Sequence, residues 1–278
     1  MKIIIFKTIY IFLFFSITLA DWDGTFNYKT FLKTKLGSFQ AGENTINIKY
    51  LINNFMHPHA VLTSKSIITN NFIKKFYSVE DSISLVMFPD MSLIHHYKSI
   101  KEKKKPLKIY STKLFKDTLV YHKLVNDEKK IQHYPRTKDP IFDPLGIIFS
   151  FINQDIDKNN EFEFLSYSKG KTQSIVLQLA GEEIIDSPNG KKKCIILSSN
   201  LSNNKINKGD IKIWVSSEND ILIPQYTPIK IQSHIKSGIL TMILDSLLYY
   251  DREVDLDSRN SYPILFKQLL HNPSELHE

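Results

Sequence analysis

The chain has 278 residues and a formal net charge of +7. Its hydrophobic content of 42% excludes a disordered chain and a polytopic membrane protein, and its nine glycines and eleven prolines exclude a collagen-like or low-complexity chain. The length is sufficient to bury the core of one large β domain or of two small ones.

The first twenty residues have the pattern of an export signal. Lys2 and Lys7 precede an apolar run over residues 9–17, and small side chains lead up to Ala20. We therefore expect cleavage between Ala20 and Asp21, and export to the periplasm of a Gram-negative bacterium. The alternative is an uncleaved segment that anchors the protein in the inner membrane. Cleavage is favoured, because the run is shorter than the ~20 residues that a spanning helix needs.

Residues 43–50 are the first segment with strand character. Apolar and polar side chains alternate there, with Ile46 and Ile48 on one face, which is typical of a half-buried strand. We expect a single antiparallel β domain over residues 21–250. A polar tail over residues 251–278, with a short helix, is expected to follow it.

Residues 98–108 carry the densest group of basic side chains. We expect a solvated loop, because like charges repel one another and stay hydrated. The alternative is contact with an anionic membrane surface through Lys101, Lys103, Lys104 and Lys105. We expect no nucleic-acid partner, since the chain has only three arginines and arginine is the residue that base and phosphate recognition favours.

One helix is predicted over residues 144–154. Asp143 is a good N-cap and Pro144 suits the first helical position. The spacing puts four apolar residues on one face of this helix, and these are Leu145, Ile148, Phe149 and Ile152. Because the helix stands between two β-rich halves, it is either a crossover of the sheet or a lid.

The C-terminal half reads as consecutive hairpins. Residues 174–198 alternate on both sides of the turn Ser187-Pro188-Asn189-Gly190, and residues 211–216 are expected to pair with 221–224. Further strands are predicted over 229–234 and 239–248. The fold class expected from this pattern is mainly β, a curled antiparallel sheet or β-barrel-like structure with a central helix and a short C-terminal helix.

The order of these features resembles the bacterial exported proteins grouped as domain-of-unknown-function family 3108 (DUF3108). The resemblance covers residues 25 to 245 and is carried by short motifs. These are Phe-Gln-Ala-Gly at 39–42, Asp-Pro-Leu-Gly at 143–146, the hairpin 183–190, the strand pair within 213–224, and Ser-Gly at 237–238. The resemblance implies an exported, β-barrel-like fold without an established activity, so no catalytic residue is carried over from the family.

One departure from the family pattern lies in the helix. An arginine expected after Asp-Pro-Leu is absent, and Phe-Ser-Phe-Ile stands at 149–152. Any family function that depends on that arginine is therefore in doubt for this chain.

The sequence lacks the usual signs of an enzyme, and we predict neither catalysis nor a cofactor. It has no Gly-x-Ser-x-Gly motif, and Glu182 and Glu183 are read as solvated neighbours on opposite faces of a hairpin. Cys194, the one cysteine, is expected to be a small buried hydrophobe. His57 and His59 have a spacing that can bind a metal ion, but no third ligand is nearby in sequence.

The function favoured by the sequence is non-catalytic binding of an apolar or amphipathic envelope component, such as a lipid or a lipoprotein-like molecule. Its cavity would be lined by Leu145, Ile148, Phe149 and Ile152, although ordinary core packing also explains these four residues. The alternative is an envelope scaffold that docks a protein or an anionic polymer. A metal-dependent hydrolase is a third and weaker hypothesis.

Overall fold

A computed structural model of the protein describes residues 22–251, apart from positions 36, 53–57, 72–73, 75–78, 104, 127, 137, 154–155, 157–158, 169–170, 188–189, 200–209, 219–222 and 236–237. The predicted cleavage site Ala20–Asp21 and the tail from residue 252, with its expected helix, lie outside the described residues. Within the described part of the chain, no helix is both long and apolar enough to cross a bilayer.

The described residues form a 15-stranded sheet in the order β8-β7-β6-β5-β4-β3-β2-β1-β15-β14-β13-β12-β11-β10-β9. Neighbouring strands are antiparallel except for β9 and β10, which are parallel. The end strands β8 and β9 do not pair, so the sheet is curled but not closed, and the mainly β prediction is confirmed. The strands are β1 (Trp22–Thr34), β2 (Gly37–Ile52), β3 (Pro58–Ile68), β4 (Val79–Met87), β5 (Leu93–Glu102), β6 (Lys108–Leu114), β7 (Thr118–Val125), β8 (Glu128–Pro135), β9 (Ile141–Phe142), β10 (Glu161–Ser168), β11 (Lys171–Ser187), β12 (Gly190–Ser198), β13 (Ile211–Ser216), β14 (Pro228–Ile235) and β15 (Gly238–Asp251).

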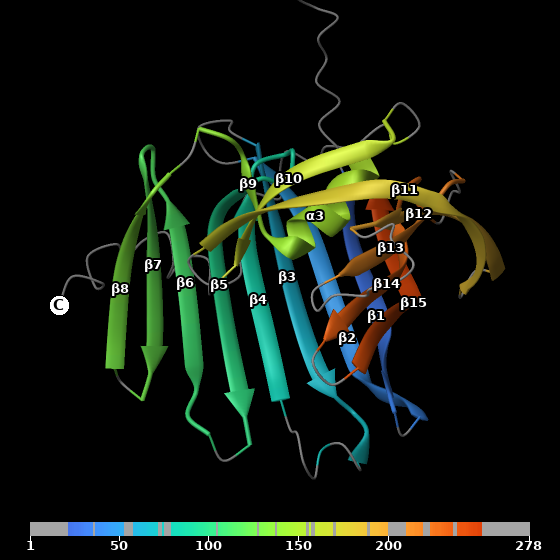
Figure 1. The fold of residues 1–278 in the computed structure, drawn as a ribbon, viewed down its shortest axis with the longest axis horizontal. Coiled ribbons are helices and arrows are strands. Elements are labelled where there is room, and N and C mark those ends of the chain that lie inside the picture. Colours follow the sequence, from blue (N-terminus) through green and yellow to red (C-terminus); the bar gives the residue numbers. More distant parts are fainter. Residues whose placement is uncertain are drawn as a thin grey trace, which may run out of the picture.

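Two meanders, β1–β8 and β10–β15, join where β1 pairs with β15. Figure 1 shows β10 and β11 crossing in front of the first meander, so that the sheet folds over its own inner face. Register shifts interrupt the pairing at five places, and such bulges increase the local twist of a strand. They lie at Asn27/Tyr28, Thr30/Phe31, Val86/Met87, Leu179/Gly181 and Trp214/Val215.

Two of the predicted strand segments are confirmed. Residues 43–50 lie within β2, where Ile46 and Ile48 are fully buried and Lys49 is exposed. Residues 174–198 lie within the β11–β12 hairpin, which is closed by pairing of Ser187 with Gly190. Burial follows the period of two in residues 43–50, whereas in the β11–β12 hairpin residues 180–184 are all exposed and the alternation is interrupted.

The second predicted hairpin is wrong in its returning strand. β13 pairs with β14, which begins at Pro228, and Ile223 and Pro224 of the predicted returning strand are in no strand, while residues 221–222 lie outside the described residues. Pro224 has no N–H to contribute to a ladder, and its carbonyl instead accepts from the Thr227 N–H at 3.1 Å within a turn. The later strands predicted over 229–234 and 239–248 are confirmed as parts of β14 and β15.

The loop predicted for residues 98–108 is also wrong. β5 continues through Lys98 and Lys101 to Glu102, and β6 begins at Lys108. The sheet tolerates these charges because Lys98 Nζ lies 2.6 Å from Asp81 on β4 and Lys108 Nζ lies 2.6 Å from Glu102. The charge run is therefore a strand, a turn and a strand.

Candidate functional site

The helix α3 (Pro144–Ser150) connects the parallel strands β9 and β10, so it is a crossover and not a lid. Asp143 is its N-cap as predicted, and the Leu145 N–H donates to the Asp143 carboxylate at 2.9 Å. A 3-10 turn, η1 (Phe151–Asn153), replaces the last predicted turn of α-helix. Gly146 lets α3 approach the β4–β5 connection closely, since a Cβ there would lie 2.9 Å from the Met91 carbonyl oxygen.

The four predicted cavity residues all lie in the packed interior. Ile148 and Phe149 are buried and Leu145 and Ile152 are half-buried against the same hydrophobic cluster. The Phe149 ring packs edge to face on that of Phe26, with ring centroids 5.0 Å apart.

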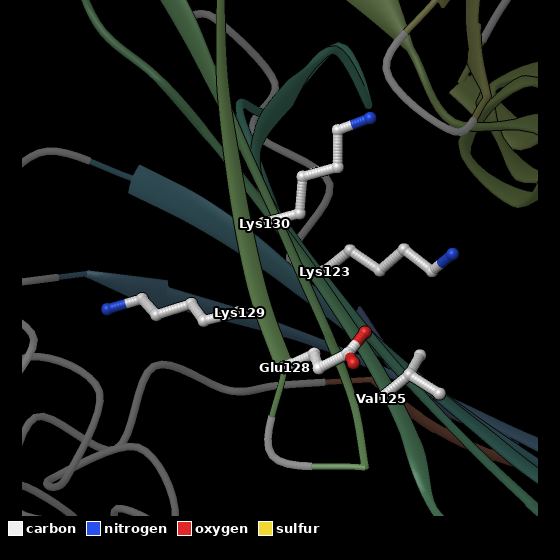
Figure 2. A pocket seen from close by; sticks show the side chains of 5 residues that line it. All are labelled: Lys123, Val125, Glu128, Lys129 and Lys130. Atoms are coloured by element: carbon white, nitrogen blue, oxygen red, sulfur yellow. The ribbon is translucent and has the colours of Figure 1, made fainter.

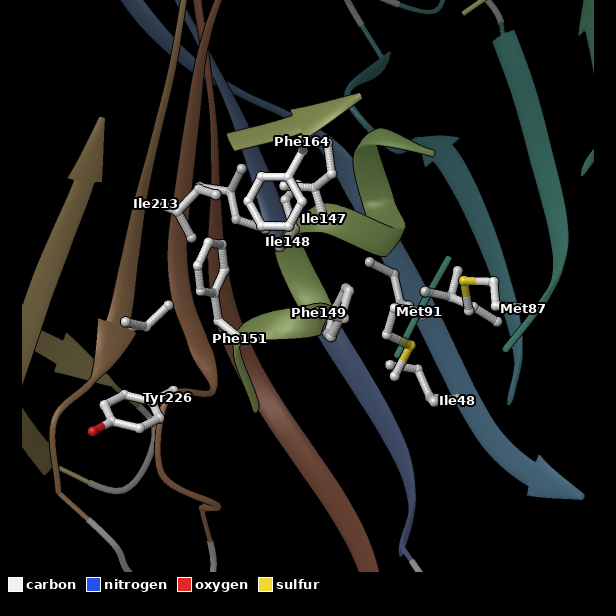
Figure 3. Close-up of a cluster of buried hydrophobic side chains, with 14 of the residues drawn as sticks. Ile48, Met87, Met91, Ile147, Ile148, Phe149, Phe151, Phe164, Ile213 and Tyr226 are labelled. Carbon is white, nitrogen blue, oxygen red and sulfur yellow. The ribbon is translucent and has the colours of Figure 1, made fainter. Parts of the chain in front are cut away.

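The burial of α3 extends beyond the predicted face. Ile147 is 3% exposed and Phe151 is fully buried, and the Phe151 ring packs edge to face on those of Phe162 and Phe164 from β10. Figure 3 shows these side chains leaving the helix in different directions. The helix is enclosed because β10 covers the side that faces away from β1–β4. The helical spacing of apolar residues does not predict this contact with β10.

A buried polar cluster surrounds the N-terminus of α3. His96 Nε2 on β5 lies 3.7 Å from Asp143 Oδ2, and the His96 ring lies edge-on to Tyr167 from β10, with centroids 6.1 Å apart. Thr112 on β6 shares a 2.5 Å hydrogen bond with the Tyr167 hydroxyl. The sheet thus collects four polar side chains from four separate segments of the chain, and sequence analysis did not connect them.

Burial displaces the titration of both ionisable groups in this cluster. It raises the pKa of Asp143 from 3.8 to about 6 and lowers the pKa of His96 from 6.5 to about 4. At neutral pH the contact is therefore between a carboxylate and a neutral imidazole, not between two opposite charges. The separation of 3.7 Å exceeds hydrogen-bond length, so the two groups are in contact without a direct hydrogen bond between them.

A second region, the open inner face, lies on β4–β8 below this cluster. Cross-strand pairing places Ile83, Lys98, Tyr110, Lys123 and Lys130 in one row. Ile83 and Tyr110 pack against the core, which identifies the row as inward-facing. Ile100 and Val125 lie in the next inward row, and all the apolar members are half-buried. Figure 1 shows α3 and β10 crossing higher on the sheet.

A shallow hollow of about 180 Å³ lies at the β7–β8 end of this face, lined by Lys123, Val125, Glu128, Lys129 and Lys130. In Figure 2 the Lys123 and Lys130 side chains leave on one side of the strands and Lys129 leaves on the other. Lys123 and Lys130 are direct cross-strand partners, and neither has an ion pair with any described residue. Like charges placed opposite each other destabilise a sheet, so this pair is an arrangement that an anion would stabilise.

The remaining predicted residues are dispersed. Lys101 and Lys103 are exposed, Lys105 is paired with Glu102, and Lys104 lies outside the described residues. His57 is also outside them, whereas His59 is half-buried on β3. Among the residues that the structure describes, no three His, Cys, Asp or Glu side chains are grouped to hold a metal ion.

The other two features that were considered for chemistry have structural partners. Cys194 is fully buried, and burial raises the pKa of its thiol to about 12. Glu183 accepts a hydrogen bond from Trp214 Nε1 at 2.6 Å, and Glu182 lies 2.7 Å from Lys193 Nζ. None of these groups is arranged as an activated nucleophile.

Comparisons with known proteins give one family and two solved structures. The model of the family described as "Protein of unknown function (DUF3108)" matches residues 27–245. A β-barrel-like protein of domain of unknown function DUF1849 from Brucella abortus covers 84% of this chain and 99% of its own, at 8% identity and a TM-score of 0.51. A DUF1329 family protein from Desulfovibrio piger covers 87% of this chain and 92% of its own, at 10% identity and a TM-score of 0.24. No curated protein sequence matches the chain.

Proposed function

Since the chain belongs to the DUF3108 family, whose description assigns no activity, we propose from its own surface that it binds an amphipathic, anionic component of the bacterial cell envelope without catalysis. The signal pattern of residues 1–20 supports export to the periplasm, and an inner-membrane anchor is the alternative.

The observation that carries the proposal is the composition of the open inner face. Half-buried Ile83, Ile100, Tyr110 and Val125 provide an apolar floor that is interrupted by the ion-paired Lys98 and Lys108. Lys123 and Lys130, which have no ion pair with a described residue, stand beside it. An apolar surface with a few convergent charged groups is what a site for an amphipathic molecule requires. We place the ligand here and not beneath α3, because the α3 side chains are already packed against other side chains.

The test is native mass spectrometry of the protein purified gently from a Gram-negative periplasm. We expect an excess mass that organic solvent releases and that is identified as a lipid, on a chain that begins at Asp21. A bare polypeptide mass contradicts the ligand, and a retained Met1 contradicts the processing.

Two neighbouring variants locate the site. Val125→Glu puts a charge on the apolar floor, whereas Leu124→Glu puts the same charge on the opposite face of β7, because successive side chains alternate between faces. We expect Val125→Glu to lower the retained lipid about tenfold, since a charge must be desolvated there, and Leu124→Glu to retain it. Equal loss in both variants would show that this face is not the site.

Docking of a partner chain is the second candidate function, and the free edge of β8 favours it. Among the described strands β8 is the end of the sheet, so one side of its backbone has no neighbour within that part of the chain. Lys129 and Lys130 are exposed on this edge, and lysines on an edge strand disfavour the addition of another strand. We therefore rank this function second. Hydrogen exchange tests it, since an added strand would protect the β8 amides in periplasmic extract and not in buffer.

A further inference from the structure

We propose that the hairpin end of β5–β8 docks on the surface of an anionic lipid bilayer. The hairpin end is defined by the connections from β5 to β6 and from β7 to β8, and by the lysines that flank them at positions 101, 108, 123, 129 and 130. The proposal concerns a surface for membrane contact and so goes beyond the ligand site. The two surfaces share Lys123 and Lys130, and the variants that test membrane contact are at other residues.

The sheet brings these two connections together from separate parts of the sequence. Lys108 is the cross-strand partner of both Ile100 and Val125, and Val125 is the partner of Glu128, so both connections lie at the same end of the sheet. Figure 1 shows this end at the bottom of β5–β8. In sequence, segments 101–108 and 123–130 together hold eight lysines and three acidic residues.

The ion pairs leave a surplus of positive charge at this end. Glu102 contacts both Lys105 and Lys108, so one carboxylate is shared between two lysines. Lys101 and Lys103 are exposed and have no ion pair with a described residue. The surplus therefore points into solvent, where it is available to an anionic surface.

An exposed apolar side chain stands within this charge. Leu107 follows Pro106 in the β5–β6 turn and is 49% exposed, between Lys105 and Lys108. Lysines around an exposed leucine fit the boundary between lipid headgroups and acyl chains, where the charges meet anionic headgroups and the leucine enters the apolar layer.

The opposite end of the same strands provides an internal comparison. The β6–β7 turn there exposes Phe115 to 47%, so it has an apolar tip of similar exposure. Its neighbour Lys116 is followed by Asp117, and Lys138 in the next turn is followed by Asp139. With Lys113 and Arg136 included, segments 113–118 and 135–139 hold four basic and two acidic residues, a surplus of two, whereas segments 101–108 and 123–130 have a surplus of five. The hairpin end therefore combines an apolar tip with the larger positive surplus.

Lysine chemistry favours a lipid surface over a nucleic acid. Lysine acts as a hydrated point charge and does not need a defined partner geometry, whereas clamping of single phosphates favours the arginine fork. The hairpin end has no arginine in either segment. Diffuse attraction to many headgroups is the interaction that such a surface supports.

The test is co-sedimentation of the full purified chain with lipid vesicles. We expect binding to vesicles of phosphatidylcholine with about 30 mol% phosphatidylglycerol, and not to vesicles of phosphatidylcholine alone. Binding should be lost between about 0.1 M and about 1 M salt, where the screening length falls from about 10 Å to about 3 Å. Equal binding to both kinds of vesicle would overturn the proposal.

Variants assign the binding to one end of strands β5–β8. We expect Lys101→Gln with Lys103→Gln to weaken binding about 25-fold, at about fivefold for each lysine, and Leu107→Asn to weaken it severalfold. The matched controls at the opposite end are Lys116→Gln with Lys138→Gln, and Phe115→Asn, which should change binding less than about twofold. All sites are exposed, and a thermal melt checks that each variant is folded.

Two results would overturn the inference. One is an equal effect of the control variants, which would show that only net charge matters. The other is binding to soluble polyphosphate or heparin without binding to anionic vesicles, which would assign the hairpin end to an anionic polymer.

Discussion

The buried carboxyl at the start of α3 gives the sharpest test of the structure. Asp143 is 6% exposed and caps the helix through the Leu145 N–H. We expect Asp143→Asn to keep this cap, because an amide oxygen also accepts the hydrogen bond, and to remove the buried negative charge. The neutral imidazole of His96 is close enough for a small shift to let it accept from the new amide.

The magnitude follows from the pKa of this group. The folded-state pKa of about 6 lies above the ordinary value of 3.8, so folding favours the protonated form. Ionisation of the buried carboxyl therefore lowers the free energy of unfolding little below pH 3.8 and by its full amount above pH 6. A difference of about two pKa units corresponds to about 3 kcal/mol in the free energy of unfolding, since one unit is about 1.4 kcal/mol.

The assay is urea unfolding of the wild type and of Asp143→Asn from about pH 4 to about pH 7.5, with the wild type subtracted at each pH. Contributions of titrating groups that do not interact with Asp143 cancel in this difference, whereas a change in the titration of His96, 3.7 Å away, stays in it. We expect Asp143→Asn to gain about 3 kcal/mol relative to the wild type as the pH rises. Asp143→Ala should show the same rise, displaced downward by about 1 kcal/mol for the lost cap.

A flat difference would refute the reasoning, because it would mean that the Asp143 carboxyl has its ordinary pKa in the fold. A difference of opposite slope would mean that the carboxylate is held by a positive partner, which would make Lys98 or a protonated His96 the dominant neighbour.

Three further predictions concern packing, backbone and acid stability. Phe149→Ala should lower the free energy of unfolding in urea by about 4 kcal/mol. The control Phe88→Ala, at a side chain that is 45% exposed, should lower it by under about 1 kcal/mol. Similar losses in the two variants would contradict the packing of α3. Gly238→Ala should lower the free energy of unfolding by about 2 kcal/mol or more, and with it the thermal midpoint. The reason is that φ of Gly238 is +148° and that a Cβ would lie 2.1 Å from the Lys33 carbonyl oxygen. An unchanged midpoint would contradict this backbone conformation. His96→Gln should remove about 3 kcal/mol of the stability loss between pH 6.5 and pH 4. The reason is that the pKa of His96 is about 4 in the fold, so the unfolded chain binds the proton first as the pH falls. An acid transition that the variant leaves unaltered would show that His96 is solvated.

The helix and the hairpins with strong turns were predictable because their signals are local. Asp143-Pro144 starts α3 where the sequence places it, and the turn 187–190 closes the β11–β12 hairpin. The second hairpin failed for a reason that is also local but easily missed. Residues 221–224 look like a returning strand, yet the turn at 224–227 delays the return to Pro228.

The arm β5–β8 was not predictable as strands, because its charges are compatible with a sheet only in the presence of partners. Lys98 needs Asp81 from the preceding strand, and Lys108 needs Glu102 across the turn. These pairs exist only once the register is set, and a pattern of charge along one segment does not contain the register.

The sequence alone determined the strand periodicity, the N-cap of α3 and the family resemblance, because each depends on residues that are neighbours in the chain. Only the tertiary structure decided that α3 is enclosed, that His96 meets Asp143, and that Lys123 faces Lys130 beside an apolar floor. The physical reason is that burial and charge balance depend on the summed surroundings of a side chain. In a curled sheet of this kind, those surroundings come from strands far apart in sequence.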